Sequence, residues 1–292
     1  MSLEPFRLER YFARWEFAAP YLLCSSDLEP YRLPELLALA DEDGLAHWQN
    51  LSLGYTEYPG HPLLRQEIAG LHTTIDPDEV FTFAGAEEAV FALMQTLVRS
   101  GDHVVATWPG YQSLYEVARS LGAEVTFLRL APETGWTFDL AELRRALRPC
   151  TRLLVLNFPH NPTGALLSQD IWRDVVALAE AADICLFSDE VYRLLECDET
   201  DRLPAAADLG RRTVSLNGQR PLRTRHPRAP AEPRRAAIPT TRHRPPKRAP
   251  WGCRRRRRRT PSRRRWTPRR RCQRPERCPR PSSGCSERGP GR

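Results

Sequence analysis

Short apolar runs alternate with amphipathic segments between residues 76 and 217. The runs predict strands, and the segments between them carry apolar residues at three- and four-residue spacing, which is typical of helices. This alternation predicts an α/β fold with a mostly parallel sheet flanked by helices, because parallel neighbours need a crossover connection. The predicted strands are Val80–Phe83, His103–Thr107, Glu124–Leu130, Arg152–Asn157, Ile184–Ser188 and Thr213–Leu216, and the predicted helices are Ala86–Arg99, Gln112–Leu121, Leu140–Leu147 and Gln169–Ala181.

The first 50 residues show a weaker pattern than the segment that follows. An amphipathic stretch at Leu33–Asp41 predicts a short helix, and a group of aromatic residues precedes it. We interpret residues 1–50 as an N-terminal arm and substrate-side segment that covers the core; the alternative is that its aromatic side chains pack on a partner. Those side chains belong to Tyr11, Phe12, Trp15, Phe17 and Tyr21.

The composition changes abruptly after Gly218. Residues 1–218 contain 17 arginines, no lysine and 33 acidic residues, for a net charge of −16. Residues 219–292 contain 26 arginines, Lys247 and three glutamates, for +24, and the two parts account for the formal net charge of +8. The second part is rich in proline and lacks periodic apolar positions, so it cannot bury enough surface to offset its ordering entropy. We therefore expect an acidic folded part and a disordered basic tail.

The sequence shows no pattern typical of targeting or metal binding. No run reaches the roughly 18 consecutive apolar residues of a membrane-spanning helix, and Met1–Arg14 alternates charged with apolar residues, unlike a signal peptide. The cysteines lack the spacing of a zinc site. We expect a cytoplasmic protein with reduced thiols, no metal site and no membrane partner.

Two polar motifs follow predicted strands. An Asn-Pro-Thr-Gly sequence begins at Asn161, and an Asp-Glu-Val-Tyr sequence begins 28 residues later at Asp189. In this order, the pair resembles the class I/II aminotransferases, which have the fold type I architecture and use pyridoxal 5′-phosphate (PLP). The resemblance implies that Asp189 holds a proton on the pyridine nitrogen and that Asn161 and Tyr192 donate hydrogen bonds to the phenolate oxygen. Taken singly, the same residues are ordinary turn, cap and core-edge residues.

Three further segments match the same family. Gly85, Ala86 and Glu87 join a predicted strand to a helix, where small residues allow backbone N–H groups of the first helical turn to bind a phosphate. The resemblance implies that these residues form the phosphate site and that Tyr111 stacks on the cofactor ring. It also implies that Tyr55 reaches the cofactor phosphate of a neighbouring subunit in a homodimer, and that the substrates are an amino acid and a 2-oxo acid. By themselves, the turns near Gly85 and Tyr55 are ordinary structural features.

The resemblance ends where the family carries its Schiff-base lysine. The chain continues as Asn-Gly-Gln-Arg from Asn217, with no counterpart of that lysine, of the arginines that bind phosphate and substrate carboxylate, or of the small domain. The single lysine, Lys247, lies in the basic tail. We therefore expect residues 51–218 to be a truncated PLP-binding large domain without a catalytic residue, and the chain to be inactive. The sharp compositional switch leads to the hypothesis that residues 219–292 are translated out of frame.

The sequence leaves two other functions open. The arginine-rich tail would neutralise nucleic-acid phosphates, so the chain is alternatively a nucleic-acid-binding protein, although such binding is largely non-specific. A third interpretation is a non-catalytic relative that keeps the cofactor pocket for binding or regulation. The pattern does not identify the amino-acid substrate or exclude other PLP reactions, such as decarboxylation.

Overall fold

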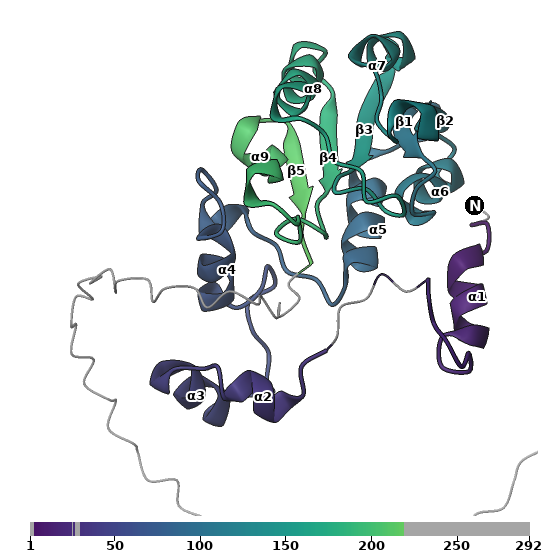
Figure 1. The fold of residues 1–292 in the computed structure, drawn as a ribbon. Coiled ribbons are helices and arrows are strands. Elements are labelled where there is room, and N and C mark those ends of the chain that lie inside the picture. Colours follow the sequence, from purple (N-terminus) through teal and green to yellow (C-terminus); the bar gives the residue numbers. More distant parts are fainter. Residues whose placement is uncertain (1–2, 25, 27–29, 219–292) are drawn as a thin grey trace, which may run out of the picture. The chain divides into compact units, whose positions relative to one another are not determined.

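The computed structural model describes residues 3–24, 26 and 30–218, which belong to the first of two units of the chain (Figure 1). The expectations for residues 219–292, namely disorder, out-of-frame translation and non-specific nucleic-acid binding, lie outside the described residues. The same holds for the expectation that Lys247 has no place in the site.

Five parallel strands form the centre of the described part, in the order β2-β1-β3-β4-β5. Strands β1 and β3 at the centre are almost completely buried and carry mainly Val and Leu in their interiors, as expected for parallel strands covered on both faces. The predicted α/β fold with a mostly parallel sheet flanked by helices is confirmed. The strands are β1 (His103–Trp108), β2 (Glu124–Arg129), β3 (Thr151–Asn157), β4 (Cys185–Asp189) and β5 (Thr213–Leu216).

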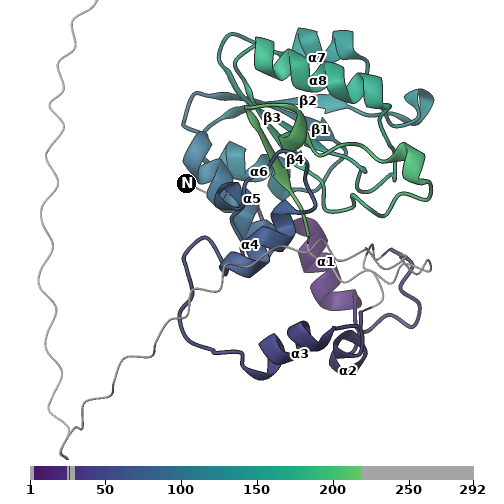
Figure 2. The same ribbon diagram turned by 90° about the vertical axis from the view of Figure 1, so that its left-hand side faces the viewer.

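Helices cover both faces of the sheet (Figure 2). Successive strand residues point to opposite faces, so Val105 packs with Trp172 on one face and Val104 packs with Met94 on the other. The two apolar clusters hold the helices on the sheet. One face carries α7 (Leu140–Ala146), α8 (Gln169–Ala181) and α9 (Ala206–Leu209), and the other carries α5 (Ala86–Leu97) and α6 (Ser113–Ser120).

The helix ends follow local signals in the sequence. Ser168 caps α8 by accepting the Ile171 N–H at 3.3 Å, as its position before the helix predicts. Gly101 lies in the turn after α5 with a φ of 89°, in the left-handed region that favours glycine. The remaining elements are α1 (Arg7–Trp15), α2 (Leu33–Leu37), α3 (Glu42–Gln49), α4 (Pro62–Ala69) and the 3-10 helices η1 (Pro77–Glu79), η2 (Pro132–Thr134) and η3 (Glu199–Asp201).

One predicted strand, Val80–Phe83, does not form. The Thr82 N–H donates to the Pro59 carbonyl at 2.8 Å instead of to a neighbouring strand, and the Thr82 hydroxyl donates to the same carbonyl. Phe81 and Phe83 are exposed. The residue types favour a strand, but a strand exists only where another strand pairs with it, so the prediction was wrong.

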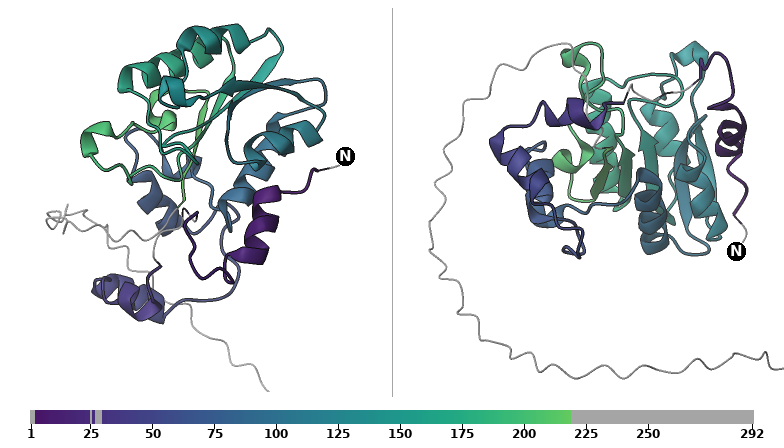
Figure 3. Two further views of the ribbon diagram at one scale, coloured as in Figure 1. Left: turned by 45° about the vertical axis from the view of Figure 1, so that its right-hand side comes forward. Right: turned by 90° about the horizontal axis from the view of Figure 1, so that it is seen from below.

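The N-terminal arm contacts the core through α1. The Arg7 N–H donates to the Gln112 side chain at 3.1 Å, and the Gln112 amide donates to the Pro5 carbonyl at 3.1 Å. Phe17 and Tyr21 are nonetheless exposed, so these two aromatic side chains do not pack on the core. Helices α2 and α3 contain no buried residue and lie outside the sheet and helix layers (Figure 3).

No helix in the described residues is long and apolar enough to cross a membrane. Within the same residues, no group of three or more His, Cys, Asp or Glu side chains could hold a metal ion.

Candidate active site

A cleft of about 2390 Å³ lies where the carboxyl ends of the central strands meet. Strands β1 and β3 are neighbours, but the chain continues from β1 to β2 at one edge of the sheet and from β3 to β4 toward the other edge. Open α/β sheets bind ligands at such a switch point in the strand order. Tyr55 does not line the cleft. The other residues predicted to bind the cofactor do: Gly85, Ala86, Glu87, Tyr111, Asn161, Asp189 and Tyr192.

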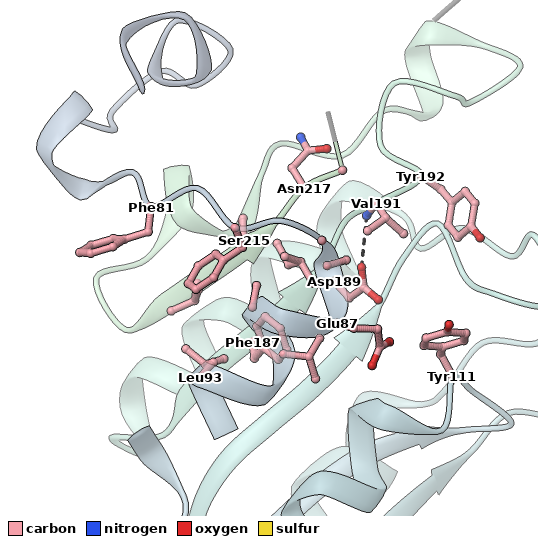
Figure 4. A pocket seen from close by; sticks show the side chains of 18 of the residues that line it. Phe81, Glu87, Leu93, Tyr111, Phe187, Asp189, Val191, Tyr192, Ser215 and Asn217 are labelled. Carbon is pink, nitrogen blue, oxygen red and sulfur yellow. Dashed lines mark hydrogen bonds between the residues drawn. The ribbon is translucent and has the colours of Figure 1, made fainter. Parts of the chain in front are cut away.

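Asp189 is the most deeply buried carboxylate that lines the cleft. It ends β4 with 6% of its surface exposed, and its Oδ1 accepts the Val191 N–H at 3.3 Å (Figure 4). Burial raises its pKa to about 7. The hydrogen bond from the Val191 N–H lowers the pKa, and the nearby Glu190 and Glu87 carboxylates raise it. Asp189 can therefore hold or release a proton close to neutral pH.

Asn157 connects the two motifs that the sequence singled out. It ends β3 opposite Asp189, donates its amide to the Asp189 carbonyl at 2.9 Å, and accepts the Asn161 N–H at 2.8 Å. The apolar pattern of the sequence predicts Asn157 at the end of a strand but no role for its side chain. A polar residue closing an apolar strand was the signal that could have revealed it.

Asn161 and Tyr192 form a pair of neutral donors at the mouth of the cleft. The Asn161 amide donates to the Tyr192 hydroxyl at 3.3 Å, and the Tyr192 hydroxyl lies 2.8 Å from the Ser26 hydroxyl. Ser26 comes from the N-terminal arm, and no local motif marks it. The pair can stabilise a negatively charged oxygen because the Asn161 amide and the Tyr192 hydroxyl can each donate a hydrogen bond.

Gly85 precedes the first turn of α5 with extended backbone. A Cβ built on Gly85 would meet no atom within 4 Å, so the space beside this turn is open. On the same turn, Glu87 accepts the Ser113 hydroxyl at 2.9 Å, and the neighbouring Glu88 accepts the Ala84 N–H at 2.8 Å. Burial raises the pKa of Glu87; Ser113 opposes this effect and Glu9 adds to it.

Tyr111 faces the cleft from the segment after β1. Its hydroxyl donates to Glu9 on α1 at 2.7 Å, and its ring meets Phe6 edge to face at a centroid distance of 4.8 Å. Burial and the hydrogen bond to Glu9 raise its pKa above the ordinary value, so the ring stays neutral. The contact with Glu9 joins two segments that are far apart in sequence, and sequence analysis did not foresee it.

His160 holds the loops that carry Tyr111 and Asn161 together. It is buried, and its two ring nitrogens lie 2.7 Å from the Thr163 hydroxyl and 2.9 Å from the Pro109 carbonyl. Burial lowers its pKa, which favours the neutral ring despite the hydrogen bond to Pro109.

Glu190 has a structural role that differs from that of Asp189 beside it. Its Oε1 accepts the Ala206 N–H at 2.8 Å and the Ser215 hydroxyl at 2.7 Å, and its Oε2 lies 3.3 Å from the Arg193 guanidinium. Glu190 thus ties α9 and β5 to β4, while Asp189 faces the cleft.

The chain matches the aminotransferase class I and II family over residues 23–216. It is 32% identical to the arginine–pyruvate transaminase of Pseudomonas aeruginosa over 214 residues, which are 71% of this chain and 54% of that protein. It is 36% identical to the aspartate/prephenate aminotransferase of Thermus thermophilus over 155 residues, which are 50% of this chain and 40% of that protein.

The solved structures agree with these matches. A PLP-dependent aminotransferase from Streptococcus suis superposes with a TM-score of 0.69 at 31% identity, covering 74% of this chain and 58% of that one. The chain therefore belongs to the class I and II aminotransferases, a PLP-dependent family. It spans about half the length of the curated relatives that it matches.

Proposed function

We propose that residues 51–218 form the cofactor-binding part of a PLP-dependent aminotransferase and that this chain holds PLP without a covalent bond. The observation that supports this best is the arrangement of Asp189, Asn161, Tyr192 and Tyr111 around one cleft, with open space beside Gly85. The cleft thus combines a buried carboxylate, two neutral donors, an aromatic ring and a helix start, which are the groups that the different parts of PLP require.

Each residue has a separate task toward the cofactor. Asp189 holds a proton on the pyridine nitrogen, and Asn161 and Tyr192 donate hydrogen bonds to the phenolate oxygen. The Tyr111 ring stacks on the pyridine ring, and the first turn of α5 after Gly85 binds the phosphate through backbone N–H groups. When bound, PLP supplies an electron sink for chemistry at the α-carbon of an amino acid.

We further propose that this chain does not carry out transamination. Residues 1–218 contain no lysine, so no side chain of this part can bind the cofactor covalently and then move a proton as a general base. Such a base typically contributes about 10²–10⁴-fold to the rate. The substrates of the working family are an amino acid and a 2-oxo acid, and the relatives above act on different amino acids by name.

A homodimer is also part of this proposal. Tyr55 and Tyr58 are almost fully exposed, and the Tyr58 ring lies 6.5 Å from the exposed Phe81 ring. Exposed aromatic groups of this kind are typical of protein interfaces. A second copy that covers them would place Tyr55 beside the phosphate of the neighbouring cleft.

Binding and trapping experiments test the proposed function. Pyridoxine 5′-phosphate, which lacks the aldehyde, is titrated into the full chain and into the D189N variant, with D174N on the exposed side of α8 as the control. We expect D189N to weaken binding about tenfold or more, since a hydrogen bond to a charged group contributes about 1.5–3 kcal/mol, and D174N to bind normally.

The second part of the test uses PLP and borohydride. We expect peptide mass spectrometry to find no pyridoxyl adduct on a side chain within residues 1–218 and assays to find no transamination. Equal binding by D189N and the unsubstituted chain would contradict the proposed site, and turnover by this chain would contradict the proposed inactivity.

A further inference from the structure

We propose that Glu87 makes binding of the cofactor phosphate proton-linked. The protonated side chain donates a hydrogen bond to the phosphate beside it, and the ionised side chain repels the phosphate. This inference rests on the proposed cofactor site, in which backbone N–H groups bind the phosphate and the Glu87 side chain has no role.

The position of Glu87 is the first argument. It follows Gly85 and Ala86 in the first turn of α5, where the phosphate is expected, and its carboxylate lies near the side chains of Asp189 and Tyr111 (Figure 4). The Ser113 hydroxyl donates to its Oε1 at 2.9 Å and keeps the carboxylate within the cleft. A phosphate at this turn would therefore lie next to a carboxyl group.

The charges around Glu87 are the second argument. Glu9 faces it from α1, Asp189 from β4, the neutral Tyr111 from the segment before α6, and Ser113 from the first position of α6. The charged residues that line the cleft are predominantly acidic: Glu9, Glu16, Glu79, Glu87, Asp189 and Asp208, against Arg211 and His72.

This charge distribution decides which form of Glu87 is compatible with a phosphate. Ionised Glu87 would add to the negative potential that opposes phosphate binding at the helix N–H groups. Protonated Glu87 removes that charge, and its hydroxyl can donate to a phosphate oxygen. Burial already raises the pKa of Glu87, and a bound phosphate raises it further because like charges disfavour ionisation.

The proposal predicts the sign of the pH effect. Binding takes up a proton on Glu87, so the affinity for a phosphate-bearing ligand falls as the pH rises through the pKa of this group. The phosphate has its own second pKa near 6, and Asp189 has a pKa of about 7. A ligand without phosphate and a variant of Glu87 separate these contributions.

The experiment compares pyridoxine 5′-phosphate with pyridoxine, using the full chain and its E87Q and E88Q variants. Glu88 is the matched control because it lies on the same turn but is held by the Ala84 N–H. As the pH rises through the pKa of Glu87, we expect the affinity of the unsubstituted chain for pyridoxine 5′-phosphate to fall about tenfold more than that of E87Q. E88Q should behave like the unsubstituted chain, and pyridoxine should show no difference among the three proteins.

Calorimetry in buffers of different ionisation enthalpy supplies a measurement that needs no variant. We expect the unsubstituted chain to take up more protons with pyridoxine 5′-phosphate than with pyridoxine, beyond the uptake due to the phosphate itself. Equal proton uptake, or the same pH dependence in E87Q, would overturn the role of Glu87 and leave the cofactor site standing. Absence of binding by both ligands would contradict the site and the role of Glu87 together.

Discussion

Asp189 links burial directly to the pH dependence of folding. An exposed aspartate has a pKa of 3.8, and the buried side chain has a pKa of about 7. Between these values the folded chain keeps a proton that the unfolded chain releases, so the free energy of unfolding falls as the pH rises from about 4 to about 7. Above pH 7 both states are ionised and this contribution stays constant.

D189N should remove this contribution because asparagine does not titrate. The contribution to the free energy of unfolding is at most about 4 kcal/mol, because each pKa unit between 3.8 and about 7 corresponds to about 1.4 kcal/mol. We expect urea unfolding to show that the unsubstituted chain loses more stability between about pH 4.5 and about pH 8 than D189N does. D174N serves again as the exposed control, and identical pH profiles for the unsubstituted chain and D189N would contradict the assigned burial effect.

At the scale of elements, the cleft depends on how two loops are joined. His160 contacts Thr163 in its own loop and the Pro109 carbonyl in the loop that carries Tyr111. H160A would leave the Pro109 carbonyl without this partner and open a cavity, and we expect it to lower the free energy of unfolding by about 2–4 kcal/mol. It should also weaken binding of pyridoxine 5′-phosphate, since Tyr111 and Asn161 lose their common support.

S168A is the control for this prediction. It removes the cap of α8, which lies in the helix layer and not in the cleft. We expect S168A to lower the free energy of unfolding by about 0.5–2 kcal/mol and to leave the affinity for the ligand unchanged. Denaturant unfolding and ligand titration on both variants check the two effects separately. If H160A bound the ligand as well as S168A does, His160 would stabilise the fold but not position the site.

At the scale of the whole molecule, the hypothesis of out-of-frame translation makes a prediction about the gene. The family match ends at residue 216, and the acidic composition changes to a basic one after residue 218. We expect one of the other two reading frames after codon 218 to encode a lysine and downstream arginines in a family-like order. A chain expressed in that frame should bind PLP covalently and catalyse transamination.

DNA sequencing of this region and assays of the restored chain check that prediction. Absence of a lysine–glycine–arginine motif from both other frames would refute the hypothesis. The present chain is the control, because it shares residues 1–218 with the restored one.

Much of the fold was predictable because it depends on short-range patterns. Helix Gln169–Ala181 and strand Thr213–Leu216 have the predicted bounds, since their apolar spacing and their flanking residues are local properties. The motif residues Asn161 and Asp189 were found in the same way, since each follows a strand whose end the apolar pattern marks. Val80–Phe83 shows the limit, because a strand also needs a neighbour and no local pattern records one.

The sequence by itself determined the fold class, the two motifs that begin at Asn161 and Asp189, and the absence of a lysine before residue 219. Only the tertiary structure decided that Asn157 joins two motifs, that Glu9 accepts the Tyr111 hydroxyl, and that Glu87 lies near Asp189 and Tyr111. The reason is physical: periodicity and turn chemistry act over a few residues, whereas these contacts and the pKa shifts they cause join strands and helices far apart in the chain.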